Sequence, residues 1–389
     1  MILPAPKSKT DSPAARWPQF ALISLFALVL LFSMLDLAFH IDPSAPPSEN
    51  RLLAARPPCP RSFDGLKKFF ADWETYFNDH FGFRKTLVNW HNRLKWQFFQ
   101  EQNANNVLVG TGGWIYMAEK RMVDHFRGTL QLTEPELQGW QKLLERRRDW
   151  LGAHGIKYIF ILAPDKHSVY PEFLPAWLKD LGARTKADQF FDYMKAHSTV
   201  EVFDPRPVLL AAKKTAPVYL QTDTHWNQLG AFLACEEVIR RLGENQLPGL
   251  TPVSLDLFEH TNRMPIGGDL VNFRGIPLSN TESNAFFFTP KPELPPLETF
   301  VPTGEHWMEV ATTKNLQSHG LAVVYSDSFG RRWIPFLGYH FGEVEFYWQD
   351  QLNGRLLERE KPVVVINEML ERFFNVTDPR RLAAKDLLP

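Results

Sequence analysis

The sequence predicts an α/β fold, a three-layer α/β/α sandwich with a mostly parallel sheet. Two observations carry this prediction: short, largely apolar segments recur along the chain, and segments with the apolar spacing of a helix separate them. Because such strands bury both faces, they are typical of a parallel sheet covered by helices on either side. The expected strands are residues 156–163, 200–203, 218–221, 321–325 and 363–367.

The first elements after the N-terminal region follow from capping and periodicity. Ser62 is the expected N-cap of a helix, and apolar residues at helical spacing from Leu66 to Phe77 predict that this helix has a buried face. A second helix is expected over 84–100, and the Gly-rich turn within 107–116 predicts a short hairpin. The glycines of this hairpin are too sparse for a phosphate-binding loop.

The helices of the sandwich have clear boundary signals. Thr133 and Glu136 form a capping box, and Gly155 can end the helix that they begin. The remaining expectations are a helix over 186–196, a helix over 227–242 that stops at Gly243, and a proline-rich insertion of loops with short strands over 244–318.

Composition limits the classes of function. The 389 residues include 43 Lys and Arg against 44 Asp and Glu, so no global charge draws the chain toward nucleic acid. With 44% hydrophobic and 13% aromatic residues, the chain is globular. Its two cysteines exclude an all-cysteine zinc site and a multi-disulfide framework. Cys59 and Cys235 either form one bridge, or Cys235 is a buried free thiol on the apolar side of its helix.

An uncharged apolar run from Phe20 to Leu35 predicts a transmembrane helix, because its extension to residue 39 reaches roughly a bilayer span. An uncleaved signal anchor is favoured over a cleaved signal peptide, since the run exceeds a typical signal core. Lys7, Lys9 and Arg16 precede the helix, so the positive-inside rule places the N-terminus in the cytoplasm. The predicted organisation is a cytoplasmic N-terminus (1–19), a signal anchor in the inner membrane (20–39), a linker (40–61) and a periplasmic domain (62–389).

Polar residues follow three of the expected strands, at the sheet edge where open α/β folds place their sites. Asp223 and His225 lie two apart after one strand, and at an extended strand end they would project to the same side. Ser328 follows another buried strand through a tight turn, which would expose its hydroxyl as a nucleophile requires. Together the three supply nucleophile, base and orienter, the logic of a Ser-His-Asp site.

Each of these residues also has a structural interpretation. Ser328 could be a helix N-cap, His225 a hydrogen-bonded histidine beside Trp226, and Asp223 the N-cap of the following helix. Metal binding by Asp223 and His225 is a third option, which no HExxH motif or cysteine cluster supports. A charged segment after the first strand is either a solvated turn or part of the same cleft; its residues are Asp165, Lys166 and His167.

At these residues the chain resembles a known family, the alginate O-acetyltransferases of the AlgJ/AlgX type, whose domain is SGNH-hydrolase-like. The resemblance covers residues 48–375, and it is specific because many motifs occur in one order. The motifs are SENRLLAARP (48–57), YFNDHFGFR (76–84), the Gly113-Trp114 hairpin, APDKHSVYPEFLP (163–175), TDTHWNQLGA (222–231), GGDL (267–270), SDSF (326–329) and EMLER (368–372).

The resemblance implies that Ser328 is the nucleophile of a GDSF-type block, with Asp223 and His225 as the Asp-x-His pair. Because this pair precedes Ser328, the motif order is similar to the circularly permuted order of the family. Backbone N–H groups around Ser328 and Phe329 are expected to stabilise the oxyanion. Ser326 replaces the usual glycine of the block, so the turn is expected to differ or to be strained.

The function that the resemblance implies is periplasmic O-acetylation, in which an acetyl group passes through an acyl-serine to hydroxyls of an exported polysaccharide such as alginate. No metal and no bound cofactor is expected. The expected acetyl donor is a partner, a polytopic membrane-bound O-acyltransferase. With its anchor, and with little chain after the last strand for a carbohydrate-binding module, the protein is more similar to the AlgJ branch.

Two rival functions stay open. An acetylesterase would use the same triad with water as the acceptor, and a non-catalytic polysaccharide-binding or assembly component would keep the fold with an impaired site. Aromatic residues near the expected cleft could stack on sugar rings, although most aromatics in such a domain are core; they are Trp114, Tyr116, Tyr170 and Trp226.

Overall fold

The computed structural model describes residues 13–39, 41, 54–60, 62–84, 86, 87, 90, 107–118, 122–178, 184–262, 268–272, 286–303 and 309–388. It divides into two compact units. The first comprises Met1–Gln100 with Asn272–Ile276, and the second comprises Glu101–Val271 with Pro277–Pro389. The linker predicted over 40–61 lies largely outside the described residues, as does most of the helix predicted over 84–100.

The first unit contains two long helices, α1 (Pro13–Phe39) and α2 (Phe63–His80). The anchor predicted over residues 20–39 falls on α1, which exposes many large apolar side chains. No helix in the described part of the chain has both the length and the apolar character needed to cross a bilayer. Helix α2 begins as predicted, because the Ser62 hydroxyl accepts a hydrogen bond from the N–H of Gly65 at 3.2 Å.

The prediction that the apolar face of α2 is buried was wrong. Phe70 is 63% exposed and Trp73 is 38% exposed. The aromatic rings stack along the helix itself instead, with Phe69 and Trp73 at 5.9 Å and Tyr76 and His80 at 4.2 Å between ring centroids. Helical spacing therefore located the apolar stripe correctly, but spacing does not say what covers the stripe.

The second unit is built around a seven-stranded sheet with the order β4-β3-β11-β9-β10-β8-β7. The pairs from β4 to β10 are parallel, and β10, β8 and β7 pair antiparallel. This confirms the prediction of a mostly parallel sheet. The strands are β3 (Lys157–Ala163), β4 (Val202–Phe203), β7 (Glu298–Phe300), β8 (Ala311–Lys314), β9 (Leu321–Ser326), β10 (Glu343–Trp348) and β11 (Val364–Leu370).

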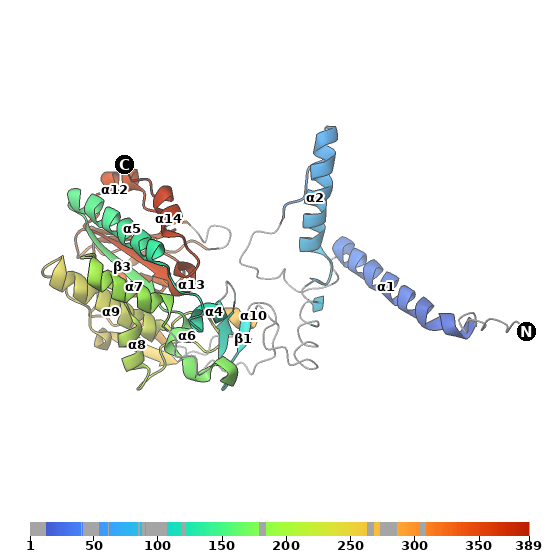
Figure 1. Cartoon of the computed structure of the whole chain (residues 1–389), viewed down its shortest axis with the longest axis horizontal. Coiled ribbons are helices and arrows are strands. Elements are labelled where there is room, and N and C mark those ends of the chain that lie inside the picture. The colour runs from blue at the N-terminus through green and yellow to red at the C-terminus, as the bar shows by residue number, and fades with distance from the viewer. Residues whose placement is uncertain are drawn as a thin grey trace, which may run out of the picture. The chain divides into compact units, whose positions relative to one another are not determined.

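Helices cover both faces of this sheet. Alternate residues of its central strands point to opposite sides, and each side packs against its own helices. Ile159 and Ile161 of β3 pack with α9 (Gln228–Asn245), whereas Phe160 and Leu162 pack with α5 (Glu134–Ala153). Figure 1 shows α5 and α9 on opposite sides of the strands. Helix α7 (Lys186–His197) joins the layer of α5, which gives the expected helix–sheet–helix order.

The boundary signals of the long helices have different outcomes. The capping box of α5 is present, since the N–H of Thr133 donates to Glu136 Oε2 at 2.8 Å. Asn227 caps α9 by accepting from the N–H of Gly230 at 2.9 Å, so Asp223 is not its N-cap. Gly243 does not stop α9. A Cβ at Gly243 would lie 2.0 Å from the carbonyl oxygen of Leu250, so this glycine permits a close approach of two segments.

The strand predicted over 218–221 was wrong. These residues join no sheet, and Tyr219 forms only an isolated antiparallel bridge with Trp226. The chain folds back on itself here, because the N–H of Leu220 donates to the carbonyl of His225 and that of Asn227 donates to the carbonyl of Val218. Strand β10 was missed because its sequence EVEFYW alternates polar and apolar residues instead of running apolar.

The smaller elements connect this framework. Two antiparallel strand pairs stand outside the main sheet, and the first confirms the hairpin expected at 107–116. They are β1 (Val107–Val109) with β2 (Ile115–Met117), and β5 (Phe258–Asn262) with β6 (Phe286–Pro290). The shorter helices are α4 (Met122–Phe126), α6 (Lys166–Val169), α8 (Arg206–Ala212), α10 (Asp269–Asn272), α11 (Ile334–Leu337), α12 (Gly354–Glu360), α13 (Glu371–Phe374) and α14 (Pro379–Lys385), with 3₁₀ turns at Pro171–Phe173, Ala176–Leu178, Leu255–Leu257 and Gly330–Trp333.

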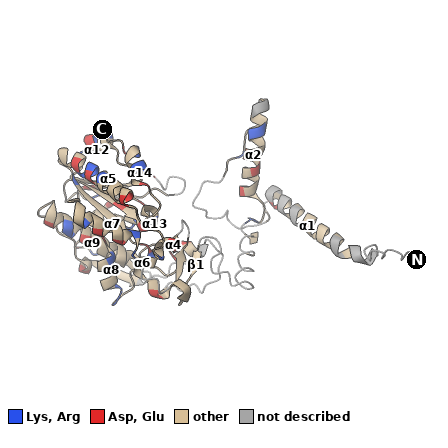
Figure 2. Cartoon of the chain, in the orientation of Figure 1, with Lys and Arg blue, Asp and Glu red and all other residues tan. Residues whose placement is uncertain are grey.

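The two cysteines form no disulfide, and the charges on the surface are of mixed sign. Both thiols are free, with Cys59 exposed and Cys235 buried on α9, as the alternative to a bridge predicted. Burial raises the pKa of the Cys235 thiol well above its ordinary value, so it is no nucleophile. Figure 2 shows Lys and Arg interspersed with Asp and Glu on helices such as α5 and α9, in keeping with the net charge of −1.

Candidate active site

Two buried carboxyl groups hold the turn that carries Ser328. Strand β9 ends at Ser326, and the carboxylate of Asp327 accepts from the N–H of Phe329 and from that of Leu370, each at 2.9 Å. Glu368 of β11 lies behind the turn, where its Oε2 accepts from the N–H of Asp327 at 3.2 Å and of Gly330 at 3.1 Å. Ser328 itself is half-buried at the C-terminal end of the strand, where the parallel-sheet argument placed it.

Burial perturbs both of these carboxyl groups. It raises the pKa of Asp327 to about 6, although its two backbone N–H donors and the charge of Arg372 oppose the shift. Burial, followed by the charge of Asp327, raises the pKa of Glu368 well above the ordinary value. Both shifts favour the protonated carboxyl, because burial and a neighbouring negative charge penalise ionisation.

The hydrogen bonds of this turn revise the expected oxyanion site. The N–H of Phe329 donates to Asp327, so it is engaged and does not point to a substrate oxygen. The N–H groups of Asp327, Gly330 and Arg331 also have acceptors. The N–H of Ser328 has none within the described part of the chain, so it is the N–H of this turn that remains available to an acceptor.

Ser326 adopts an ordinary backbone conformation. The non-glycine residues with positive φ in the described ranges are Phe83 and Lys361, so the strain expected at Ser326 is absent. Its side chain is buried against Gly330, where a Cβ would lie 2.4 Å from the Cβ of Ser326. A glycine four positions later thus makes room for the side chain of Ser326.

Asp223 and His225 form the predicted pair, although they lie in a turn and not at a strand end. Asp223 Oδ1 accepts from His225 Nδ1 at 2.6 Å and from the His225 N–H at 2.9 Å. Burial alone would raise the pKa of Asp223, but the charge and hydrogen bonds of His225 outweigh it and hold this pKa below its ordinary value. His225 Nε2 is buried and has no hydrogen-bond partner among the described residues, so it is free to accept a proton.

The two blocks meet at Phe329. The rings of His225 and Phe329 lie 5.0 Å apart between centroids, and Phe329 is the residue directly after Ser328. Trp226 packs on the same ring at 5.0 Å, and Arg372 lies 5.9 Å from its centroid. The structure thus places His225 next to Phe329, the neighbour of Ser328. No hydrogen bond joins His225 to Ser328 in the described residues.

Lys166 fastens the loop that carries Asp223. Its buried Nζ donates to the carbonyl oxygens of Leu220 and Gln221 at 2.9 Å and to that of Asp223 at 2.6 Å. The ammonium also lies over the ring of Trp114 at 5.6 Å. Neither alternative for Lys166 holds, because it is neither a solvated charge nor a lining residue of a cleft.

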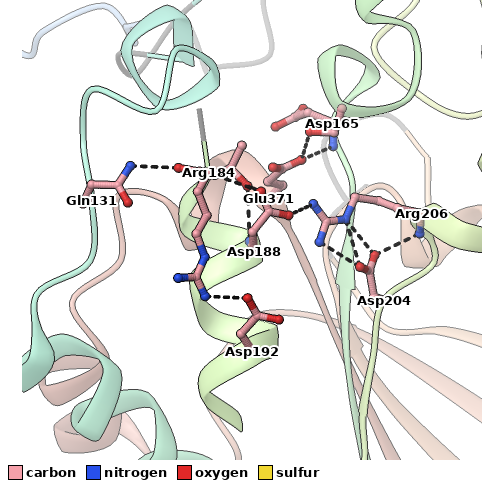
Figure 3. A network of polar contacts seen from close by, with 10 residues as sticks. Gln131, Asp165, Arg184, Asp188, Asp192, Asp204, Arg206 and Glu371 are labelled. Atoms are coloured by element: carbon pink, nitrogen blue, oxygen red, sulfur yellow. Dashed lines mark hydrogen bonds and ion pairs between the residues drawn. The ribbon is translucent and has the colours of Figure 1, made fainter. Parts of the chain in front are cut away.

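The neighbours of Lys166 are buried supports as well. Asp165 pairs with Arg372 at 2.8 Å, and its N–H donates to Glu371, which also accepts from the hydroxyl of Ser168. Figure 3 shows Glu371 beside Asp165, with Arg206 nearby binding both Asp188 and Asp204. Burial, followed by the charge of Asp165, raises the pKa of Glu371 to about 7.

His167 is also a support and not a lining residue. Burial, together with the charges of Lys166 and Arg372, lowers the pKa of His167 to about 3, so its imidazole stays neutral. Its ring packs against Tyr116, with 5.0 Å between the centroids.

The aromatic residues expected to stack on sugars are buried in the core. Their exposed fractions are 4% or less, and Trp114 stacks on Tyr170 at 4.2 Å and on Phe173 at 4.8 Å. The hydroxyl of Tyr170 accepts from the N–H of Val218 at 2.9 Å, and that of Tyr116 donates to the carbonyl of Tyr170. These rings present no face to a ligand, which corrects the assignment of Tyr170 and Trp226 to a substrate cleft.

The sequence argument missed Asp269 as a site residue, although it quoted the GGDL motif that contains it. Asp223, His225 and Asp269 offer ligand atoms within 4.8 Å of one another, the one such group in the ranges that the structure describes. The hydrogen bonds within this group account for its geometry without an ion. Asp327 and Glu368 were also quoted only within motifs, and their acid–base character follows from burial that no local pattern reveals.

The chain is similar to known proteins over part of its length. Residues 107–286 match the family model described as "SGNH hydrolase-like domain, acetyltransferase AlgX". The "Probable alginate O-acetylase AlgJ" of Pseudomonas putida is 27% identical over 213 residues, which cover 54% of this chain and 52% of that protein. The chain spans about half the length of the curated relatives it matches.

Solved structures share the fold. Bacillus cereus PatB1 has a TM-score of 0.54 at 14% identity, over 70% of this chain and 98% of that one. A DHHW family protein from Eubacterium siraeum has a TM-score of 0.53 at 14% identity, over 74% of this chain and 97% of that one. At these identities the likeness concerns the fold alone.

Proposed function

We propose, from the membership of residues 107–286 in the AlgX/AlgJ family of SGNH hydrolase-like acetyltransferases, that the chain is an O-acetyltransferase that works through an acyl group on Ser328. One observation carries the proposal. His225 has its Nδ1 bound to Asp223 at 2.6 Å and its Nε2 without a partner in the described residues, beside the turn of Ser328. A nitrogen held in this way is the general base that a serine nucleophile needs.

The reaction divides into two half-reactions. His225 Nε2 takes the proton of the Ser328 hydroxyl as Oγ attacks the acetyl carbonyl of the donor, and His225 returns that proton to the leaving group. In the second half, His225 removes the proton of an acceptor hydroxyl, which attacks the acyl-serine and releases the Ser328 hydroxyl. The N–H of Ser328 stabilises the oxyanion in both halves.

The acceptor and the donor are part of the proposal. The name of the P. putida relative, "Probable alginate O-acetylase AlgJ", supports a polysaccharide hydroxyl as the acceptor. We propose that a membrane-bound O-acyltransferase supplies the acetyl group from the other side of the inner membrane, because acetyl-CoA is a cytoplasmic metabolite. The catalytic unit then works in the periplasm, where an exported polymer is accessible.

The triad is tested by substitution in the full chain, purified in detergent. Ser328→Ala and His225→Ala should each lower the turnover of a chromogenic acetyl ester by at least about 1,000-fold, and Asp223→Asn should be severely impaired because the imidazole loses its orienter. Thermal unfolding of Ser328→Ala should match that of the parent chain. Turnover that survives Ser328→Ala would exclude an acyl-serine on this residue.

The choice of acceptor separates transfer from hydrolysis. The full chain is given the same ester with and without oligosaccharides, both uronic-acid and neutral. A transferase should yield acetylated oligosaccharide, detected by mass, with acetate as a slower product, because a bound sugar competes with water at high effective molarity. Acetate alone would make the protein an esterase, and a folded chain that turns over no ester would be non-catalytic.

A further inference from the structure

Asp269 contacts both members of the Asp223–His225 pair, yet the reaction described above gives it no task. Its N–H donates to Asp223 Oδ2 at 3.2 Å. Its Oδ2 accepts from the hydroxyl of Thr224 at 2.6 Å, and its Oδ1 accepts from the N–H of Thr224 at 2.8 Å. The same Oδ2 lies 3.7 Å from His225 Nδ1, so two carboxylates face one side of the imidazole.

Thr224 connects Asp269 to the imidazole. Its Oγ1 lies 3.2 Å from His225 Nδ1 and 2.6 Å from Asp269 Oδ2, and the residue is only 3% exposed. A hydroxyl has a single proton, and an ionised carboxylate can only accept. The Thr224 proton therefore goes to Asp269, which leaves the lone pairs of Oγ1 facing Nδ1.

This direction of the hydrogen bonds decides where the imidazole carries its proton. Every oxygen within reach of Nδ1, from Asp223, Thr224 and Asp269, is then an acceptor or a negative charge. Nδ1 must carry the proton, and Nε2 keeps its lone pair toward the side of Phe329 and Ser328. The tautomer that a general base requires thus has a second support besides Asp223.

The backbone keeps Asp269 in this place. The N–H of Gly268 donates to the Thr222 hydroxyl at 3.0 Å, and the N–H of Leu270 donates to the Thr222 carbonyl at 3.2 Å. A Cβ at Gly268 would lie 2.3 Å from the carbonyl carbon and oxygen of Thr222, so only glycine allows this approach. The segment 268–270 is therefore fitted against the loop of the pair along its backbone.

We propose that Asp269 is a positioning residue of the active site, which acts through Thr224 to fix the Nδ1-protonated tautomer of His225 and, through its backbone N–H, to hold the carboxylate of Asp223. Its charge, 3.7 Å from Nδ1, also favours the imidazolium that forms when His225 accepts a proton. The catalytic consequence rests on the proposed function, whereas the tautomer assignment does not.

The test uses the full chain and three variants. Asp269→Asn introduces an amide that can donate, Thr224→Val removes the hydroxyl and keeps the shape, and Thr224→Ser keeps the hydroxyl. The first readout is the rate at which phenylmethanesulfonyl fluoride inactivates the protein, because Ser328 Oγ attacks the sulfur, fluoride leaves, and His225 takes the hydroxyl proton. The second is kcat and KM for a chromogenic acetyl ester.

We expect Asp269→Asn and Thr224→Val to lower the inactivation rate and kcat by roughly 10- to 100-fold, less than the about 10⁴-fold cost of losing a direct orienter. KM should stay within about twofold, and Thr224→Ser should restore most of the rate. Parent-like rates in both Asp269→Asn and Thr224→Val would overturn the proposal. So would equal losses in Thr224→Ser and Thr224→Val, since the hydroxyl would then play no part.

A spectroscopic readout separates this inference from the proposed function. In chain labelled with ¹⁵N histidine, the proton of His225 should reside on Nδ1, and Asp269→Asn should populate the other tautomer while the protein stays folded. If the parent chain neither turns over ester nor reacts with the sulfonyl fluoride, the proposed function fails. The nitrogen shifts would then still decide the tautomer, and an unchanged tautomer in Asp269→Asn and Thr224→Val would refute the positioning role.

Discussion

At the scale of single residues, Ser326 and Gly330 share one space behind the turn that carries Ser328. The side chain of Ser326 is accommodated because Gly330 has none. A Cβ at Gly330 would lie 2.4 Å from Ser326 Cβ and 3.0 Å from Glu368 Oε2. The two positions are therefore coupled, and neither can be interpreted alone.

Gly330→Ala should destabilise the chain by about 1 to 3 kcal/mol and lower ester turnover, because an overpacked turn shifts Ser328. Ser326→Gly alone should cost less, and the double substitution should recover most of the stability lost in Gly330→Ala. Urea unfolding of the four chains gives the coupling free energy. Additive effects would mean that the two residues do not compete for space.

Lys166 donates hydrogen bonds to backbone carbonyls of the loop that carries Asp223, more than 50 positions away in the sequence. Lys166→Met keeps the length of the side chain and removes three hydrogen bonds to the loop of Asp223, so kcat should fall by at least about tenfold as the pair loses its position. Lys213→Met is the matched control, because Lys213 also binds a carbonyl, that of Val169, outside this loop. Equal loss of kcat in both variants would point to general destabilisation.

At the scale of elements, two buried acidic residues, Glu368 and Glu371, lie at the C-terminal end of β11. Glu371 begins α13 directly after the strand, and its carboxyl is buried against the N–H of Asp165 and the hydroxyl of Ser168. Its pKa is raised to about 7 by burial and by the Asp165 charge. The folded chain thus binds a proton at pH 5 to 7 that the unfolded chain, with a carboxyl pKa of about 4.3, has released.

The sign of the pH dependence follows. A raised carboxyl pKa adds stability that is complete below about pH 4 and is lost as the pH rises through 7. Glu371→Gln cannot titrate, so the unfolding free energy of the parent chain should fall relative to that of the variant between pH 4.5 and 8, by about 1 to 3 kcal/mol. Parallel stability curves for the two proteins would show that Glu371 is ionised in the fold.

Strands and helices could be predicted where the apolar pattern within the element itself identifies it. Strands β3, β9 and β11 are largely apolar because helices cover both faces, and this signal is local. Strand β10 pairs with the antiparallel β8 and alternates, so it gave no such signal. The segment 218–221 is apolar for a different reason, since Val218 and Tyr219 are buried without pairing in a sheet.

The Asp223–His225 pair could be predicted from the sequence, whereas the residues that support it could not. Asp223 and His225 stand close in sequence, so spacing alone could pair them. Lys166 reaches carbonyls 54 to 57 positions away, and Asp269 reaches Thr224 across 45 positions. Such contacts depend on how loops meet in three dimensions, and no periodicity or capping rule constrains them.

At the scale of the whole molecule, the proposed location of the chain rests on the sequence of α1. We propose that the uncharged run from Phe20 to Leu35 is a signal anchor with the remaining chain in the periplasm, although no helix among the described residues has the length and apolar character needed to cross a bilayer. A phosphatase fused after Pro389 should then be active, and a reporter that folds only in the cytoplasm should be silent. An active cytoplasmic reporter would reverse the proposed topology.

Strand β11 lies between β3 and β9, although the ribosome delivers it after every other strand of the sheet. Until residues 364–370 emerge, the other strands can form at most two separate half-sheets, β4-β3 and β9-β10-β8-β7, each with an unpaired edge where β11 belongs. One half carries the turn of Ser328, and the other leads into Lys166. The last strand therefore joins the two sides of the site, and incomplete chains are exposed to edge-to-edge aggregation until it is made.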